Sequence, residues 1–319
     1  GAWHNTDKRS RTHRRPPTDW DAEHILLRII KCVSGTVELE LSCEPAFDYH
    51  RQTTTWEYTG ACYEEATATC PGSEDWTQHP TLKLTSNLNL GIEGPEVIAR
   101  TRMTEGEEKF VALSWSPLPA PKTQEEAAAK MWQTSECWRQ WITIGRFPDH
   151  PWRGYLQRSA LTLKGLTYAP TGALLAASTT SLPETLGGER NWDYRYAWVR
   201  DSTFALWGLY TLGLDREAND FFAFIFDVCS EENGDFRPLQ VMYGVGGESS
   251  LEEHELPHLS GYGGAKPVRI GNGAFDQRQH DIWGTILDSV YLHVRSREQV
   301  PETLWPMLKR QVEEAIAHW

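Results

Sequence analysis

Residues 181–202 read SLPETLGGERNWDYRYAWVRDS, and this stretch organises the interpretation of the whole chain. Two glycines precede a run in which four aromatic residues alternate with other residue types: Trp192, Tyr194, Tyr196 and Trp198. A period of two is typical of an extended segment whose aromatic rings face one side. Arg200 and Asp201 follow directly and lead into an apolar run with helical spacing.

Aromatic rings beside a charged pair match the chemistry of carbohydrate recognition. The flat C–H face of a pyranose packs on an aromatic ring, while its hydroxyl groups need donors and acceptors in fixed directions. Arg200 offers a fork of donors and Asp201 offers two acceptor oxygens. A structural ion pair beside core aromatics would give the same pattern, so this chemistry alone leaves both interpretations open.

A second block supports the first. Residues 256–284 read LPHLSGYGGAKPVRIGNGAFDQRQHDIWG. The two blocks resemble the signatures SLPE-x-x-GG-x-RNWDYRY-x-W-x-RD and HL-x-GY…PVRIGN-x-A…Q-x-Q-x-D-x-x-G of the bacterial and archaeal branch of glycoside hydrolase family 15. That branch contains glucoamylases, glucodextranases and the trehalases of actinobacteria. Two long motifs in the family's order identify the chain as similar to this family and leave the substrate open.

Composition excludes several other classes of function. The 319 residues carry a net charge of −13, which argues against a nucleic-acid partner, so the basic run at residues 8–15 is interpreted as a solvated loop. No apolar run reaches the length of about 18 residues that a membrane-spanning helix needs. Six cysteines lack CxxC or zinc-finger spacing, which predicts free thiols in a reducing compartment and a cytoplasmic location.

Residues 1–118 are predicted to form an antiparallel β-sandwich, which the family also places before its catalytic domain. The runs at residues 25–33 and 36–42 read as strands, and Ser34-Gly35 between them is interpreted as a hairpin turn. Shorter strands are expected near residues 55–57, 82–84, 96–99 and 109–114. The family has β-structure before this point, so the N-terminal part of the domain is expected to precede residue 1.

Residues 119–148 are predicted to form a linker helix, because residues 125–130 (EEAAAK) are strong helix formers with acids in the first turn. The remainder, residues 149–319, alternates helical runs with long loops. The resemblance implies an (α/α)6 barrel, of which these residues would form about the first half. Helices are expected over residues 151–168, 201–212, 214–229, 282–294 and 302–319.

The resemblance implies hydrolysis with inversion, in which one carboxylic acid protonates the leaving oxygen and a carboxylate activates water. The family's general acid is a Glu in a loop reading roughly E-P-D-x-G-I-W-E, and its base lies much later. Neither motif occurs in this sequence, so no catalytic residue is assigned here, and both glutamates are expected C-terminal to Trp319.

The resemblance also implies which residues bind substrate. Arg200 and Asp201 match the pair that holds the far hydroxyls of a terminal glucose, which restricts the enzyme to chain ends. Tyr194 matches an aromatic residue near the reacting centre, and Trp192 is the expected stacking platform. Contacts further out are expected from the second block, with a structural role left open for the last: Arg269, Asn272 and Gln277.

The basic, Pro-interrupted opening and the segments AFDYHR (residues 46–51) and VMYGVGGE (residues 241–248) resemble the actinobacterial trehalases, which implies cleavage of α,α-trehalose to glucose. Actinobacterial trehalases imply a homo-oligomer that depends on phosphate and Mg2+, although no residue here shows a metal or phosphate site. The alternatives are a glucoamylase or glucodextranase, which would release β-glucose from α-glucan ends, and a non-catalytic carbohydrate-binding fragment. In every case the expected partner is a small carbohydrate.

Overall fold

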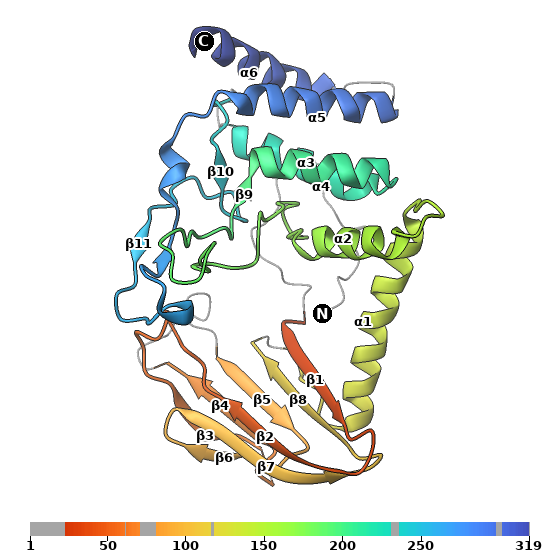
Figure 1. Cartoon of the computed structure of the whole chain (residues 1–319), viewed down its shortest axis with the longest axis vertical. Coiled ribbons are helices and arrows are strands. Elements are labelled where there is room, and N and C mark those ends of the chain that lie inside the picture. Colours follow the sequence, from red (N-terminus) through yellow and green to blue (C-terminus); the bar gives the residue numbers. More distant parts are fainter. Residues whose placement is uncertain are drawn as a thin grey trace. The chain divides into compact units, whose positions relative to one another are not determined.

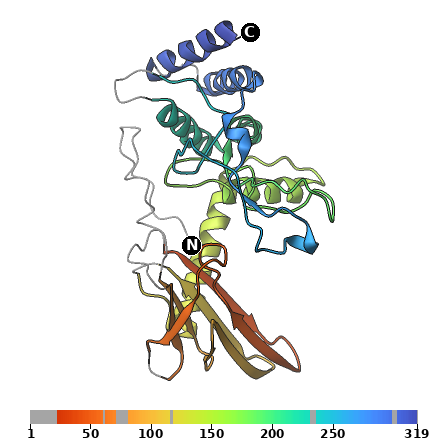
Figure 2. The same cartoon turned by 90° about the vertical axis from the view of Figure 1, so that its left-hand side faces the viewer.

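The computed structural model describes residues 23–60, 62–70, 81–115, 118–230, 236–297 and 302–318. Contacts divide these residues into two compact units, an antiparallel β unit up to Arg139 and a helical unit from Gln140 onward (Figure 1 and Figure 2). The basic run at residues 8–15 lies outside the described residues. No helix in the described part combines the length and apolar character that crossing a bilayer requires.

The β unit consists of two antiparallel sheets. The larger has the order β1 (Ile25–Lys31), β8 (Glu108–Ser114), β5 (Leu82–Ser86), β4 (Glu65–Thr69) and β3 (Thr55–Tyr58). The smaller has the order β2 (Thr36–Cys43), β7 (Glu96–Thr104) and β6 (Gly91–Glu93). One apolar cluster takes buried side chains from both sheets, so they pack face to face as the predicted sandwich; its members include Trp56, Leu84, Val97, Ala99 and Val111.

The expected hairpin between the first two strands is wrong. β1 pairs with β8 and β2 pairs with β7, so the turn at Ser34-Gly35 carries the chain from one sheet to the other. The apolar faces of the two strands pack on different clusters. Ile25, Leu27 and Ile29 of β1 pack against Phe110, Ala112 and Ala127, whereas Leu39, Leu41 and Cys43 of β2 pack against the cluster that the two sheets share. The chain passes between the same two sheets again between β7 and β8. Backbone hydrogen bonds from Glu105 N to Gly35 O (2.9 Å) and from Gly106 N to Cys32 O (2.9 Å) join these two connections.

The expected helices are present. They are α1 (Gln124–Ile144), α2 (Arg153–Gly165), α3 (Val199–Thr211), α4 (Asp215–Cys229), α5 (Asp281–Arg297) and α6 (Trp305–His318), the last preceded by a short 3-10 turn at Glu302–Leu304. Helices α3, α5 and α6 lie one beside the next, with α4 next to α3 (Figure 1). α3 begins two residues before the expected Asp201, which places Arg200 and Asp201 in its first turn.

The described part of the helical unit contains a large apolar core and a buried ion pair between two helices. The core includes Phe221, Phe224, Leu206, Ile286 and Met307, drawn from four helices. Lys164 of α2 lies 2.6 Å from Glu217 of α4, and Trp141 of α1 donates to the same Glu217 oxygen at 2.9 Å. A buried pair of this kind is stable only when its hydrogen bonds are satisfied, and here the bonds to Glu217 join α1, α2 and α4.

Two long loops carry both sequence motifs, and short antiparallel strand pairs hold their ends. β9 (Ala197–Trp198) pairs with β10 (Met242–Tyr243), and β11 (His254–Glu255) pairs with β12 (Arg269–Ile270). A 3-10 turn at Gly273–Asp276 follows and leads towards α5. These pairings bring residues from the two motifs, which lie about 80 positions apart, to the same region of the unit, as the hydrogen bonds between them show.

Candidate functional site

The aromatic segment at residues 192–198 is extended, as its alternation predicts. It lies antiparallel to residues 176–181, with backbone bonds from Ala177 N to Tyr194 O (3.0 Å) and from Ser181 N to Trp192 O (3.1 Å). Burial largely follows the same alternation: two of the three intervening residues and the residue after the segment are buried, while the aromatic side chains are half-buried. The buried set is Asp193, Ala197 and Val199. The aromatic rings therefore occupy the more accessible side of the segment.

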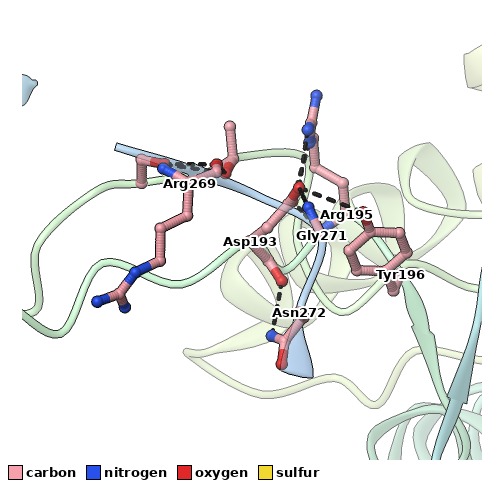
Figure 3. A network of polar contacts seen from close by, with 8 residues as sticks. Asp193, Arg195, Tyr196, Arg269, Gly271 and Asn272 are labelled. Atoms are coloured by element: carbon pink, nitrogen blue, oxygen red, sulfur yellow. Dashed lines mark hydrogen bonds and ion pairs between the residues drawn. The ribbon is translucent and has the colours of Figure 1, made fainter. Parts of the chain in front are cut away.

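Asp193 is the centre of a buried polar network, named here the Asp193 network (Asp193, Arg195, Tyr196, Gly271 and Asn272). Its Oδ1 accepts from the Arg195 backbone N (3.1 Å) and Nε (2.9 Å), and its Oδ2 accepts from Arg195 Nη2 (2.7 Å) and Gly271 N (3.3 Å). Tyr196 OH lies 3.4 Å from Oδ2, and the Asn272 amide donates to the Asp193 carbonyl at 3.0 Å (Figure 3). The carboxylate is 0% exposed and its oxygens are satisfied within the chain, which indicates a structural role.

The second-motif side of this network depends on Gly271 and Asn272. Gly271 has φ +77°, and a Cβ there would lie 1.8 Å from the Glu252 carbonyl oxygen, so only glycine fits. Asn272 is buried, and its Oδ1 accepts from Ala274 N at 3.0 Å while its Nδ2 contacts Asp193. The oxygen and the nitrogen of the Asn272 amide are both hydrogen-bonded inside the protein, which favours a structural role over the expected sugar contact.

The backbone of Arg269 is fixed by the first motif. Its N donates to Ser181 Oγ (2.8 Å), and its carbonyl accepts from Ser181 Oγ (2.9 Å) and Thr180 Oγ1 (2.8 Å). Ser181 adopts φ +59°, which is uncommon for a residue with a side chain, so these bonds hold it in a restricted conformation. The Arg269 side chain extends away from Asp193 (Figure 3).

The Arg269 guanidinium lies on Trp192. Its Cζ is 4.3 Å from the centre of the Trp192 ring, a distance at which a cation attracts the ring face. Its Nε lies 3.3 Å from Glu253 Oε1, and the side chain is only 12% exposed. Arg269 thus covers one face of Trp192, the expected stacking platform. Glu253 was not expected here as a binding residue, and no local pattern distinguishes it from the neighbouring glutamates.

A second polar group is accessible, and is named the Arg200 cluster (Arg200, Asp201, Gln277, Gln279 and Asp281). Arg200 Nη1 donates to Gln279 Oε1 (2.8 Å) and lies 3.2 Å from Asp281 Oδ2. Gln279 Nε2 donates to Gln277 Oε1 at 3.1 Å. Asp201 lies 3.9 Å from Arg200 Nε, and the Arg200, Asp201 and Asp281 side chains are 39%, 50% and 52% exposed.

Several groups of the Arg200 cluster are left open. Among the described residues, nothing forms a hydrogen bond with Arg200 Nε or Nη2, with the Asp201 carboxylate or with Gln277 Nε2. The open set contains donors and an acceptor on adjacent residues, which is the combination that vicinal hydroxyl groups require. The cluster can therefore bind a polyhydroxylated ligand without breaking bonds inside the protein.

Tyr194 shares the electrostatic environment of this cluster. Its phenol pKa is raised above the ordinary value, first because the side chain is partly buried and then because Glu184 and Asp201 are negative, while Arg190 opposes the shift. Tyr194 is therefore a neutral hydroxyl group at physiological pH. The structure brings together Arg200, Asp201 and Gln277 from the expected set, and it places Arg269 on Trp192, whereas Asn272 belongs to the Asp193 network.

Comparison with known proteins agrees with the motifs. The family model "Glycosyl hydrolases family 15" matches residues 151–319. The chain is 73% identical over its whole length to a trehalase of Mycolicibacterium smegmatis and 74% identical to a trehalase of Mycobacterium tuberculosis, covering 48% and 47% of those proteins. A trehalase of Thermoplasma acidophilum is 36% identical over 92% of the chain and 48% of that protein. The chain thus spans about half the length of the curated relatives it matches.

Proposed function

Because the chain belongs to glycosyl hydrolase family 15, we propose that the protein is an exo-acting α,α-trehalase that hydrolyses trehalose to glucose with inversion. The support is twofold. Relatives that are 73% and 74% identical over the whole chain are named trehalases. The Arg200 cluster leaves donors and acceptors open, and this single observation carries the argument from the structure.

In this proposal the Arg200 cluster binds the terminal glucose. Arg200 donates to hydroxyl oxygens through Nε and Nη2, and the Asp201 carboxylate accepts from hydroxyl groups, both as charge-assisted bonds. Arg200 and Asp201 sit on successive positions of the first turn of α3, where the helix N-terminus favours the negative Asp201. A glucose residue with free far hydroxyls meets these needs, whereas an internal residue of a polymer does not.

Tyr194 is proposed to lie beside the reacting carbon. A neutral phenol can support the oxocarbenium-like transition state with its oxygen and its ring without adding a formal charge. Its place in the aromatic segment that leads directly into Arg200 and Asp201 supports this role. The acid and base glutamates that inversion requires are proposed to lie C-terminal to Trp319, so no proton-transfer step is assigned to the residues described here.

We further propose that residues 149–319 form about the first half of an (α/α)6 barrel. Residues 119–148 would link this barrel to a sandwich domain at residues 1–118. The N-terminal part of the sandwich domain is proposed to lie before residue 1. Among the described residues, α1 in the proposed linker, the five helices α2 to α6 after it and a family match that begins at residue 151 support this architecture. A structure of the complete protein with glucose bound is the direct test. A helical array that does not close around the sugar would contradict the barrel.

Dependence on Mg2+ and phosphate is a separate question. Among the described residues, no three His, Cys, Asp or Glu side chains are grouped so that they could hold a metal ion. The described residues therefore do not form a Mg2+ site, and no step of the proposal passes through one. Activity assayed with EDTA, and with phosphate omitted, tests both dependences. Light scattering and cell fractionation test the proposed homo-oligomer and cytoplasmic location.

A glucoamylase or glucodextranase is the second candidate, because the open groups of Arg200 and Asp201 would contact only the terminal glucose, which these substrates share with trehalose. Proton NMR of the purified protein given trehalose and maltotetraose together separates the candidates. We expect β-glucose to appear first from trehalose while maltotetraose persists. Preferential consumption of maltotetraose would support a glucoamylase, and turnover of neither would leave glucodextranase activity or carbohydrate binding without catalysis.

A further inference from the structure

We propose that Gln279 is a positioning residue that sets the direction of hydrogen bonding in the Arg200 cluster, so that Gln277 presents an NH2 donor to the bound sugar. The inference rests on the proposed function, since it assumes that this cluster contacts the substrate. The inference concerns the orientation of the two glutamine amides. The residue type does not determine this orientation, because an amide has one end that accepts and one end that donates a hydrogen bond.

Arg200 is the first donor in this series of hydrogen bonds. A guanidinium has five N–H donors and no acceptor, so the end of Gln279 that faces it at 2.8 Å must be the carbonyl oxygen Oε1. Asp281 Oδ2 lies 3.2 Å from the same Nη1. Both hydrogens of Nη1 are then engaged, and the orientation of the Gln279 amide follows from the chemistry of its partner.

The direction continues to Gln277. With its oxygen on Arg200, Gln279 turns its NH2 group towards Gln277, at 3.1 Å from Oε1. An NH2 group only donates, so Gln277 must answer with its oxygen, and its own NH2 group points away from Gln279. Among the described residues this NH2 group has no partner, and the Gln277 side chain is exposed.

The backbone supports the same arrangement. Gln277 has extended angles of φ −78° and ψ 151°, and its N is anchored to Ala274 O at 3.1 Å. Side chains two apart in an extended segment lie on the same side, which brings Gln277 and Gln279 together and leaves Asp281 to open α5. The Q-x-Q-x-D pattern therefore builds a directed chain of hydrogen bonds rather than a group of interchangeable polar residues.

An outward donor at Gln277 accommodates more types of sugar atom than an outward acceptor would. A hydroxyl group can accept or donate, but the ring and bridging oxygens of a glycoside can only accept. A donor satisfies either kind of atom, whereas an acceptor in the same place would oppose a ring or bridging oxygen. The fixed direction thus permits contact with an acetal oxygen as well as with a hydroxyl group.

Two substitutions reverse the outward group by different routes. Gln279→Glu keeps an acceptor for Arg200 but has no donor for Gln277, so the Gln277 amide turns and exposes its oxygen. Gln277→Glu keeps an acceptor for Gln279 but replaces the outward NH2 group with a carboxylate oxygen. We expect each variant to raise KM for trehalose and Kd for glucose about 3- to 10-fold, the effect of one hydrogen bond, with kcat changed less than about 2-fold.

Protonation gives a readout that a merely structural role would not affect. The carboxyl group that Gln277→Glu introduces carries an O–H donor once it is protonated. In this variant the raised KM should therefore fall towards the wild-type value as the pH approaches about 4.3, the ordinary pKa of glutamate. The wild-type KM should not show this change. A raised KM that is independent of pH would contradict a donor requirement at this position.

The control is Gln133→Glu, which makes the same change on an exposed position of α1 in the β unit. We expect its kinetic and binding constants to equal those of the wild type. If both test variants also behave like the wild type in glucose binding, measured by calorimetry, the inference is wrong while the proposed function stands. A wild-type protein that binds glucose but hydrolyses none of the candidate substrates contradicts the proposed function and leaves the binding comparison valid.

Discussion

The Asp193 network and the Arg200 cluster pair the same two residue types within one short motif, yet their surroundings differ completely. The Asp193 carboxylate is 0% exposed and satisfied by Arg195, Tyr196 and a backbone N–H group. The Arg200 and Asp201 side chains are 39% and 50% exposed and keep unpaired groups. An Asp–Arg pair is structural where the chain supplies its partners, and available to a ligand where the chain leaves some out.

This difference predicts opposite consequences of mutation. A buried carboxylate that loses its charge leaves its donors unsatisfied, which lowers the free energy of unfolding. An exposed pair contributes little to stability, because water screens its charges and replaces its hydrogen bonds. Changes in the Asp193 network should therefore affect stability first, and changes in the Arg200 cluster should affect substrate binding first.

The largest effect on stability is expected from Asp193→Asn. The substituted amide cannot accept all of the donors that converge on the carboxylate, so the free energy of unfolding should fall by roughly 2–3 kcal/mol. Chemical denaturation followed by circular dichroism measures this loss. Asp288→Asn, an exposed position on α5, is the control and should be neutral. Equal stability of the two variants would remove the distinction between the two regions.

Arg200→Ala should produce the reverse pattern. It removes two open donor groups that we propose bind the terminal glucose, so kcat/KM should fall about 100-fold. The free energy of unfolding should change by less than about 0.5 kcal/mol, as for other exposed positions. Steady-state kinetics with trehalose and thermal unfolding are measured on the same preparation, with Arg153→Ala on α2 as the control. A large loss of stability would place Arg200 with the structural residues.

Glu253→Gln tests a case between the two. Glu253 lies 3.3 Å from Arg269 Nε and holds the guanidinium that covers Trp192, but it is 27% exposed. We expect a KM increase of about 3-fold and a loss of stability below about 1 kcal/mol, because a partly exposed ion pair is weak. Glu255→Gln, two residues along the same strand region and exposed, provides the control. No change in KM would argue that the Arg269–Trp192 stack lies outside the binding site.

The smallest effect is expected from Tyr194→Phe, which keeps the ring and removes the hydroxyl group. A loss of about 2- to 3-fold in kcat would match one neutral hydrogen bond. The pKa of Tyr194 is raised, so the phenol stays protonated below its ordinary value of about 10. The pH profiles of kcat for wild type and Tyr194→Phe should therefore be parallel up to about pH 9. Tyr155→Phe, an exposed residue of α2, is the matched control.

The sequence predicts where helices and strands lie better than it predicts which strands pair with one another. Alternation and helical spacing are local, so the helices and the long strands are found within a few residues of their expected bounds. The pairing of β1 with β8 rather than β2 depends on which sheet buries each apolar face, and a turn sequence does not contain that information. The strand β4 was not expected, because its core residues are the small Ala66 and Ala68.

The candidate site shows the same limit. Motif resemblance selects Arg200, Asp201 and Tyr194, but the letters do not distinguish the saturated Asp193 from the open Asp201. The cover of Trp192 by Arg269 joins positions that are 77 apart in the sequence, so only the folded chain shows it. The directed bonds from Arg200 to Gln277 are likewise a product of the folded arrangement.

The Asp193 network also has a consequence for folding kinetics. Its bonds join residues that are 78 and 79 positions apart, while the helices on either side form from local contacts. Closing so long a loop costs entropy before the network returns any stabilisation, so this region is expected to form late, after α3 and α4 have packed. The bonds of the Arg200 cluster to the second motif span 79 and 81 positions, so this candidate binding site is expected to form at the same late stage.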